Sequence, residues 1–272
     1  MTATPSASAS ASAASPARGP GDGHQLLAGK TVLVTAAAGT GIGSAAALRC
    51  AAEGATVAIS DRHERRLAEA ARTLERQTGN RPLAIPCDGT EQAQVDHLID
   101  TVAAEFGRID VVINNVGLGG LASIVDMTDE QWNSVLDVTL TATFRATRAA
   151  LRHMVPRRQG VIVNNASVLG WRAQAGQAHY AAAKAGVMAL TRCAAMDVAQ
   201  YGIRINAVSP SIAMHPFLAK VSTEETLAEL VSREAFGRAA EPWEVANVMV
   251  FLASDYSSYM TGEIVSVSSQ HP

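Results

Sequence analysis

The chain has 272 residues, of which 48% are hydrophobic and 17% are charged, and its formal net charge is −3. This length and apolar content suffice for one large buried core, so we expect a single domain. Acidic and basic residues are interspersed, and no basic patch indicates a nucleic-acid partner or an anionic membrane surface. No stretch approaches the ~20 apolar residues that a membrane-spanning helix needs, so we expect a soluble protein.

The three cysteines, Cys50, Cys87 and Cys193, lie far apart and form no Cys-x-x-Cys pair. They indicate neither a disulfide framework nor a zinc site, so we expect a metal-free protein of the reducing cytoplasm. The segment from Met1 to His24 is rich in Ala, Ser, Pro and Gly and has neither an apolar run nor a basic start. We expect this segment to be a disordered tail rather than a secretory signal.

Strand-like and helix-like patterns alternate from Lys30 onward. The expected strands cover residues 31–36, 56–60, 82–86, 110–114, 160–166, 203–209 and 263–267. The expected helices cover residues 41–53, 63–77, 91–105, 128–154, 178–200 and 241–253. This alternation predicts one doubly wound, Rossmann-like α/β domain over residues 28–272, in which a seven-stranded parallel sheet carries helices on both faces. Ligands of such domains bind at the C-terminal ends of the strands.

Residues 211–236 break the alternation of strands and helices. The bulky side chains near their start are Met214, His215, Pro216, Phe217 and Leu218. We expect a loop with short helices here, which forms a lid over the bound ligands.

A glycine-rich turn follows the first expected strand. The segment Thr35-Ala-Ala-Ala-Gly39-Thr40-Gly41-Ile42-Gly43 leads from this strand into an Ala-rich helix. Glycines in such a turn let the backbone approach a pyrophosphate, and the exposed N–H groups and dipole of the helix start favour the anion. Turns also collect glycine for steric reasons, so the glycines alone are a weak indication.

An acidic residue ends the second expected strand. Asp61 lies eighteen residues after Gly43. A carboxylate at this point accepts hydrogen bonds from the ribose hydroxyls of adenosine and repels a 2′-phosphate, which predicts NAD as the cofactor. The alternative is a helix N-cap for the stretch from Arg62 to Gln77, and the two roles are compatible.

The segment Tyr180-Ala-Ala-Ala-Lys184 places a phenol and an ammonium on one face of an expected helix. A nearby positive charge lowers the pKa of a tyrosine from about 10 by favouring the phenolate. Tyr180 can then take a proton from an alcohol or return one to a carbonyl. Ser167, thirteen residues upstream, is placed to hold the same oxygen by a hydrogen bond. Taken alone, the Tyr-x-x-x-Lys spacing occurs by chance on many helices.

Together, the glycine turn, the segment Asn114-Asn115-Val116-Gly117, Ser167 and the Tyr180/Lys184 pair resemble the short-chain dehydrogenase/reductase family from about Ala28 to the C-terminus. The resemblance implies an enzyme that transfers a hydride between a nicotinamide and a secondary alcohol or ketone. In that reaction, Tyr180 is the acid/base, Ser167 orients the substrate oxygen, and Lys184 lowers the pKa of Tyr180 and holds the nicotinamide ribose.

The resemblance also implies where NAD binds and how the chains assemble. Asp88 is expected to hydrogen-bond the adenine, and Asn115 to flank the adenosine. The full set of implied cofactor-binding residues is Thr35, Gly39, Gly41, Ile42, Asp61, Arg62, Asp88, Gly89, Asn115, Val116, Gly117, Tyr180, Lys184, Pro210 and Ile212. A homotetramer is implied, built from the long helices 128–154 and 178–200.

Some positions depart from the family pattern. Ala36 or Ala37 stands where a glycine is usual, and alanine disfavours positive φ, so the phosphate cradle is expected to be reshaped. Thr139 replaces an Asn that supports a water-linked proton relay behind the lysine, and its hydroxyl is expected to order that water as the fourth catalytic group. Ser211 replaces a usual Gly, and His215 replaces a Thr that commonly contacts the nicotinamide carboxamide.

Four stretches are similar to actinobacterial dehydrogenases of steroid C/D-ring breakdown. They begin at Ser167, Asn206, Ala235 and Gln270. This likeness implies a ring hydroxyl of a steroid-derived bicyclic acyl-CoA as the substrate. The cationic side chains of Arg172 and Lys220 are suited to the phosphates of CoA, and a solvated Arg172 is the alternative. The competing substrates are a 3-oxoacyl thioester and a small polyol or sugar.

Two other classes of function are open at this point. A cofactor-binding protein that has lost turnover is supported only by Thr139. His179 permits a catalytic triad with Ser167, but the sequence Asn-Ala-Ser167-Val-Leu is not the G-x-S-x-G turn of a serine hydrolase. We therefore expect His179 at the rim of the pocket or in solvent.

Overall fold

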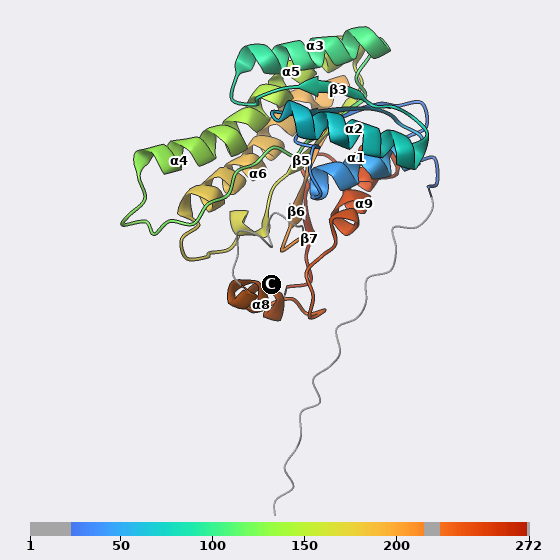
Figure 1. Cartoon of the computed structure of the whole chain (residues 1–272). Coiled ribbons are helices and arrows are strands. Elements are labelled where there is room, and N and C mark those ends of the chain that lie inside the picture. The colour runs from blue at the N-terminus through green and yellow to red at the C-terminus, as the bar shows by residue number, and fades with distance from the viewer. Residues whose placement is uncertain (1–22, 215–223, 271–272) are drawn as a thin grey trace, which may run out of the picture.

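A computed structural model describes residues 23–214 and 224–270, apart from the side chain of Thr226. One sheet of seven parallel strands runs through it (Figure 1). The strands are β1 (Thr31–Val34), β2 (Thr56–Asp61), β3 (Leu83–Pro86), β4 (Val111–Asn114), β5 (Gly160–Asn165), β6 (Ile203–Pro210) and β7 (Ile264–Val267). Their order is β3-β2-β1-β4-β5-β6-β7, which confirms the predicted doubly wound α/β fold.

Helices cover both faces of the sheet (Figure 1). One face packs against α1 (Ile42–Ala52), α2 (Glu64–Thr78) and α9 (Pro242–Ala253). The other face packs against α3 (Gln92–Phe106), α5 (Ala142–Arg157) and α6 (Ala178–Val198), and α4 (Asp129–Leu136) extends that layer. The helix α8 (Glu224–Ser232) stands apart from both layers, below β6 and β7 in the view of Figure 1.

Alternation along the strands divides the core between the two faces. In β1, Val32 and Val34 belong to the cluster under α1 and α9, whereas Leu33 belongs to the cluster under α3 and α5. All three side chains are fully buried, because successive residues of a strand point to opposite faces and both faces are covered. This arrangement explains why the strands are continuous apolar runs.

The sequence predicted one regular helix over residues 128–154, but the structure has two α-helices there, joined by a π-helical turn. The first begins with a capping box between Thr128 and Gln131, and α4 and α5 are separated by one π-helical turn at Asp137–Thr141. The side-chain hydroxyl of Thr139 bonds to the backbone of Leu118 instead of pointing along the helix. This tertiary contact coincides with the wider turn, in keeping with the frequent occurrence of π-helical turns at functional sites.

The folded part begins earlier than the expected boundary at residue 28. The backbone N–H groups of His24 and Leu26 donate to the Glu53 carboxylate, at 2.7 and 3.0 Å, and Leu27 is fully buried. The remainder of the expected tail lies outside the described residues, as do His215, Pro216, Phe217, Leu218 and Lys220 of the expected lid.

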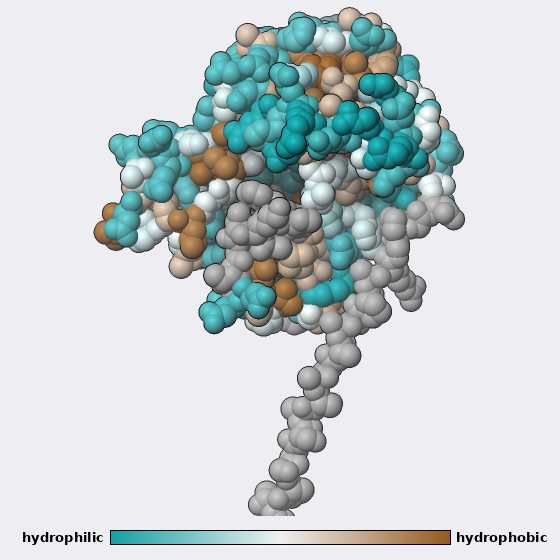
Figure 2. Space-filling view, in the orientation of Figure 1, coloured by the Kyte–Doolittle hydropathy of each residue, from teal (hydrophilic) through white to brown (hydrophobic). Residues whose placement is uncertain are grey.

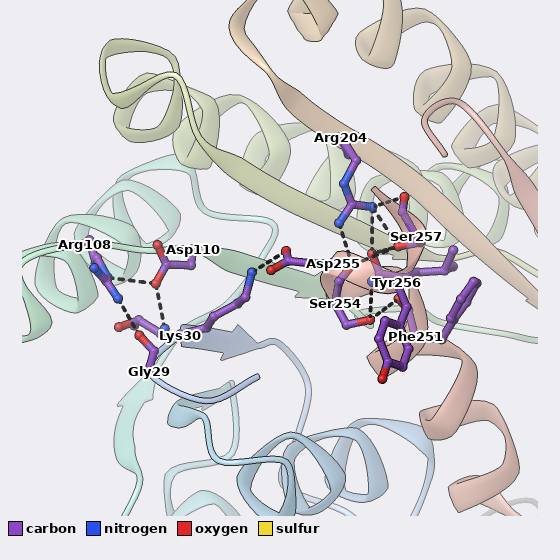
Figure 3. A network of polar contacts seen from close by, with 12 residues as sticks. Gly29, Lys30, Arg108, Asp110, Arg204, Phe251, Ser254, Asp255, Tyr256 and Ser257 are labelled. Atoms are coloured by element: carbon purple, nitrogen blue, oxygen red, sulfur yellow. Dashed lines mark hydrogen bonds and ion pairs between the residues drawn. The ribbon is translucent and has the colours of Figure 1, made fainter. Parts of the chain in front are cut away.

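Charged side chains join distant elements at the N-terminal edge of the sheet (Figure 3). The Arg204 guanidinium, near the start of β6, donates to three main-chain oxygens at and beyond the end of α9. These acceptors are Leu252, Ser254 and Ser257, at 3.1, 2.9 and 3.0 Å. The ammonium of Lys30, just before β1, lies 2.7 Å from a carboxylate oxygen of Asp255. The start of the sheet is thereby tied to the end of α9.

Asp110, just before β4, is the second centre of this edge. Its carboxylate accepts hydrogen bonds from the backbone of Thr31 and from the guanidinium groups of Arg108 and Arg157, each at 2.9 Å. Three donors satisfy this buried carboxylate.

Among the described helices, none combines the length and apolar character that crossing a bilayer requires. The described residues also contain no group of three or more His, Cys, Asp or Glu side chains arranged to hold a metal ion.

Candidate active site

The glycine turn lies at the C-terminal end of β1 and is held by its neighbours. Ala36 adopts φ +51°, the left-handed conformation that alanine disfavours, so the departure from glycine leaves a strained backbone here. A β-carbon on Gly43 would lie 2.4 Å from the Ala36 oxygen and 2.5 Å from the Asn115 amide nitrogen. Only glycine fits at position 43, because α1 passes this close to β1 and β4.

The start of α1 suits an anionic group. Its N-cap is Gly41, which contributes no side-chain cap, and the first turn of α1 contains no acidic residue. The first N–H groups of a helix have no partner within the helix and carry the positive end of its dipole. Together with the open turn at Gly39, these donors fit the pyrophosphate of a dinucleotide.

Asp61 lies at the end of β2, beside this turn. Its carboxylate accepts hydrogen bonds from the backbone N–H groups of Ala38 and His63, at 3.3 and 2.9 Å. Burial raises the pKa of Asp61, and these hydrogen bonds and two nearby arginines act in the opposite direction. The N-cap of α2 is His63, so the alternative of Asp61 as the N-cap was wrong, and the carboxylate instead links β2 to the glycine turn.

Asp88 and Gly89, which are predicted to lie on the adenosine side, follow β3. The Asp88 carboxylate accepts hydrogen bonds from the backbone and the hydroxyl of Thr90, at 2.9 and 2.7 Å. The backbone hydrogen bond is the main cause that lowers the pKa of Asp88. Gly89 lies next to Val116, since a β-carbon on Gly89 would be 3.8 Å from that side chain.

The end of β4 is fixed by a hydrogen-bond chain that crosses three strands. Thr35 accepts from the Asn115 backbone at 2.9 Å, and the Asn115 side chain donates to the Ala36 oxygen at 3.2 Å. The Asn165 amide, at the end of β5, donates to the Asn115 side-chain oxygen at 2.9 Å. Asn165 was missed in the sequence, although it stands only two residues before Ser167.

Ser167, Tyr180 and Lys184 converge as predicted. Ser167 is 9% exposed, its side chain accepts from the Leu169 backbone at 3.2 Å, and it lies close enough to the Tyr180 hydroxyl to act against the rise in the pKa of Tyr180. The Lys184 ammonium lies 5.6 Å from the centre of the Tyr180 ring. The site therefore brings one hydroxyl, one phenol and one ammonium together at the C-terminal end of β5 and the start of α6.

The charges in this group differ from the sequence expectation. Burial raises the pKa of Tyr180, and the hydrogen bond with Ser167 opposes this shift, so the expected lowering by Lys184 is not seen in the isolated chain. Burial also lowers the pKa of Lys184 to about 8. Its ammonium donates to the Asn165 main-chain oxygen at 2.6 Å, which fixes its position.

Thr139 supports the loop that passes in front of Lys184. It is fully buried, and its hydroxyl accepts from the Leu118 N–H at 3.0 Å and donates to the Leu118 oxygen at 3.2 Å. A β-carbon on Gly117 would lie 3.5 Å from the Lys184 ammonium and 3.9 Å from the Thr139 hydroxyl. The hydroxyl has one lone pair left, so its main observed role is to hold the backbone at residues 117–118.

A pocket of about 280 Å³ lies between the loop after β4, α4 and the start of α6, and it reaches Tyr180 at Gly119, where a β-carbon would be 4.0 Å from the Tyr180 ring. It is lined by Leu118, Gly119, Gly120, Leu121, Ala122, Glu130, Gln131, Ser134, Val135 and His179. His179 lines this pocket, which agrees with the first of its two expected places, but it is only 2% exposed, so the alternative place in solvent was wrong. Its Nδ1 has no partner among the described residues. Figure 2 shows apolar groups on the projecting lobe formed by α4 and the preceding loop, where Leu121, Ile124 and Val125 are exposed.

The remaining predicted residues lie around this edge. Pro210 ends β6 and pairs with Val267, and the Ile212 oxygen accepts from the Ala240 backbone at 2.9 Å. Trp171 is 51% exposed, and the neighbouring Arg172 donates a hydrogen bond to Gln270.

The arrangement suits proton transfer to or from an oxygen next to a bound dinucleotide. Comparison with known proteins agrees with this chemistry. Residues 36–269 match a family model described as Enoyl-(Acyl carrier protein) reductase. The chain is 64% identical over 251 residues to the (5R,7aS)-5-hydroxy-7a-methyl-1-oxo-2,3,5,6,7,7a-hexahydro-1H-indene-carboxyl-CoA reductase of Mycobacterium tuberculosis, covering 92% of this chain and 96% of that protein.

Two further similarities span nearly the same region. The chain is 38% identical over 242 residues to a 3-oxoacyl-(acyl-carrier-protein) reductase of Thermotoga maritima, covering 89% of this chain and 97% of that protein. A crystal structure of a short chain dehydrogenase from Mycobacterium smegmatis has a TM-score of 0.85 and 58% identity, and the match covers 94% of this chain and 99% of that one.

Proposed function

Because the chain belongs to the short-chain dehydrogenase/reductase family, we propose that it transfers a hydride between NAD(H) and a ring ketone or hydroxyl of a steroid-derived bicyclic acyl-CoA. The observation that carries this proposal is the 64% identity to the mycobacterial indene-carboxyl-CoA reductase across almost the whole of both chains. The converging Ser167, Tyr180 and Lys184 side chains support turnover, and count against a cofactor-binding protein that has lost it.

In this proposal each side chain acts on one oxygen of the substrate. The nicotinamide supplies or accepts the hydride when it is bound. The Tyr180 hydroxyl gives its proton to the carbonyl oxygen during reduction and becomes a phenolate, and during oxidation the phenolate takes the proton of the alcohol. Ser167 holds that oxygen by a hydrogen bond, and Lys184, anchored on the Asn165 oxygen, would hold the nicotinamide ribose.

The substrate class is tested by comparing three compounds. We expect kcat/KM to be highest for a bicyclic hydroxy-methyl-oxo-indane carboxyl-CoA, and lower for its free acid and for a linear 3-hydroxyacyl-CoA. Equal turnover of the linear thioester would favour the 3-oxoacyl reductase activity named for the Thermotoga relative. Equal turnover of the free acid would show that CoA is not recognised.

The preference for NAD over NADP is the second part of the proposal. The Asp61 carboxylate stands at the end of β2 beside the glycine turn, where it can accept from the ribose hydroxyls and repel a 2′-phosphate. We expect Asp61→Ala to shift the ratio of kcat/KM for NAD to that for NADP toward NADP by about tenfold or more. Arg62 is exposed next to it, and Arg62→Ala is the matched variant, because a guanidinium can bind that phosphate. An unchanged ratio in Asp61→Ala would contradict this assignment.

We also propose a cytoplasmic homotetramer assembled through α5 and α6. Phe144 on α5 is 40% exposed and Met196 on α6 is 77% exposed, which is unusual for large apolar side chains and supports burial in an interface. The free thiols of all three cysteines support a reducing compartment. Light scattering is expected to give four times the 28.3 kDa mass of one chain, and Phe144→Asp to reduce it.

A further inference from the structure

A chain of hydrogen bonds that starts at the Glu234 carboxylate joins three segments that are far apart in the sequence. Glu234 follows α8, is 5% exposed, and accepts from the backbone and hydroxyl of Ser269 at 3.2 and 2.8 Å. It also accepts from the Gln270 side-chain amide at 2.9 Å. The Gln270 side-chain oxygen in turn accepts a hydrogen bond from Arg172, five residues after Ser167. Backbone pairing between Glu234 and Gln270 and between Ala235 and Ser269 reinforces this contact.

The donor and acceptor groups in this chain of hydrogen bonds fix which way the Gln270 side-chain amide is oriented. A carboxylate only accepts hydrogen bonds, so Glu234 must face the NH₂ of Gln270. The amide oxygen of Gln270 then points to Arg172, which only donates. The carboxylate polarises the amide and strengthens its oxygen as an acceptor. The Gln270 side chain is therefore held from both ends in one orientation.

Arg172 has a neutral partner in this arrangement. Its partner is a neutral amide, and within residues 23–214 and 224–270 no ion pair joins it to an acidic side chain. It is only partly buried, and it lies on the segment that begins at Ser167. A guanidinium that is oriented but not neutralised is suited to bind a phosphate.

We propose that Glu234 and Gln270 are positioning residues that hold Arg172 to bind a phosphate group of the acyl carrier of the substrate. This inference rests on the proposed oxidoreductase function. It assigns to the Arg172 guanidinium the recognition of a thioester whose carrier bears phosphate over a small thioester without one. It also gives the C-terminal residues a role in substrate recognition, since they form the support behind Arg172.

The test compares two thioesters of the same acyl group, one with CoA and one with N-acetylcysteamine, which lacks phosphate. We expect Arg172→Ala to raise KM for the CoA thioester by about tenfold, with kcat and the kcat/KM of the small thioester nearly unchanged. Gln270→Ala and Glu234→Gln are expected to raise the same KM about threefold or more, because Arg172 loses its fixed orientation. Gln174→Ala, a neutral change on the Arg172 loop, is the matched control and is expected to have no effect.

The most discriminating measurement is the change in KM for the CoA thioester when the Arg172 and Gln270 substitutions are combined. In the Arg172→Ala background, Gln270→Ala is expected to cause no further loss, because its effect acts through Arg172. Additive losses, or equal losses for both thioesters, would overturn the inference and assign the cluster a structural role. Thermal melting and NADH binding of each variant identify any general loss of folding. If Gln270→Ala loses folding, Gln270→Met removes the amide while keeping a similar side-chain volume, and its KM for the CoA thioester is measured instead.

The acyl group is any one that the wild-type enzyme accepts, whether bicyclic or linear. A failure of the bicyclic substrate assignment is therefore measured separately from a failure of Arg172 to recognise the phosphate. A wild-type enzyme that uses both thioesters with equal KM would refute phosphate recognition while leaving the oxidoreductase function in place.

Discussion

The N-terminal and C-terminal edges of the sheet differ in how their polar groups are paired. At the N-terminal edge, Asp110 has three donors, Arg204 caps the end of α9, and Lys30 pairs with Asp255 (Figure 3). At the C-terminal edge and just beyond it, several buried polar atoms have no partner among the described residues. They are the side-chain oxygens of Asn114, Asn165 and Ser209, and Nδ1 of His179.

The two edges differ in how completely their polar side chains are paired, and the size of the cavity does not explain the difference. The cleft at the N-terminal edge, about 560 Å³, is larger than the pocket of about 280 Å³ beside Tyr180. Its charged lining residues are nevertheless already paired within the chain, so they have little left to offer a ligand. Buried polar atoms without a partner among the described residues lie instead at the opposite edge, as is common at functional sites.

Removing the Tyr180 hydroxyl is the most severe test of the C-terminal edge. We expect Tyr180→Phe to lower kcat by about 10²–10⁴-fold, because the proton donor is lost while little volume changes. The temperature of unfolding and the affinity for NADH should remain close to those of the wild type. A variant that keeps more than about a tenth of the wild-type rate would remove Tyr180 from the proton-transfer step.

Arg204→Met is the converse change at the N-terminal edge. It leaves three main-chain oxygens at the end of α9 without their donor, so we expect a loss of about 1–3 kcal/mol in the free energy of unfolding. The kcat measured well below the melting temperature should be unchanged. Arg152→Met, which removes an exposed ion pair of 3.4 Å, is the control and should change stability little. A loss of kcat without a loss of stability would show that this edge takes part in the reaction.

Thr139→Val combines both kinds of effect. The Leu118 N–H and oxygen lose their buried partner, so unfolding should become easier by about 1–3 kcal/mol. Because the same loop passes Lys184, we also expect kcat/KM to fall, by up to about tenfold. Thr139→Ser keeps the hydroxyl and should stay near the wild type in both measurements. A fully active and fully stable Val variant would show that this hydroxyl is dispensable.

The smallest effect concerns the pH dependence of stability. The pKa of Lys184 is lowered from 10.5 to about 8 by burial, so between these values the folded chain has released a proton that the unfolded chain still binds. In this window, Lys184 should make stability rise with pH, by at most about 1.4 kcal/mol per pH unit. Denaturant unfolding at several pH values isolates this contribution as the difference between the wild type and Lys184→Met. A difference that does not vary above pH 8 would show that the lysine is not desolvated.

Much of the site could be predicted from spacing along the chain. The helical offset of four between Tyr180 and Lys184, and the turn from β1 into α1, are local patterns whose geometry is set by the backbone. The ends of parallel strands bring such patterns together, so the edge that carries the site followed from the fold class.

Other features were hidden because they depend on segments distant in the sequence. The π-helical turn at Asp137–Thr141 accompanies the bond between Thr139 and Leu118, and the burial of His179 depends on the loop after β4. The pKa of Tyr180 depends on desolvation, which the neighbouring lysine alone does not predict.

By itself, the sequence determined the order of strands and helices and the edge of the sheet at which a dinucleotide is expected. These follow from periodicity and short-range spacing, which persist wherever the segment is placed. The choice of Ser167, Tyr180 and Lys184 as the catalytic group came from the family resemblance and stays a prediction. Only the tertiary structure decided which polar groups are paired, which are buried without a partner, and how Glu234 and Gln270 hold Arg172. Burial and long-range hydrogen bonds depend on which surfaces meet after folding, and no local pattern records that.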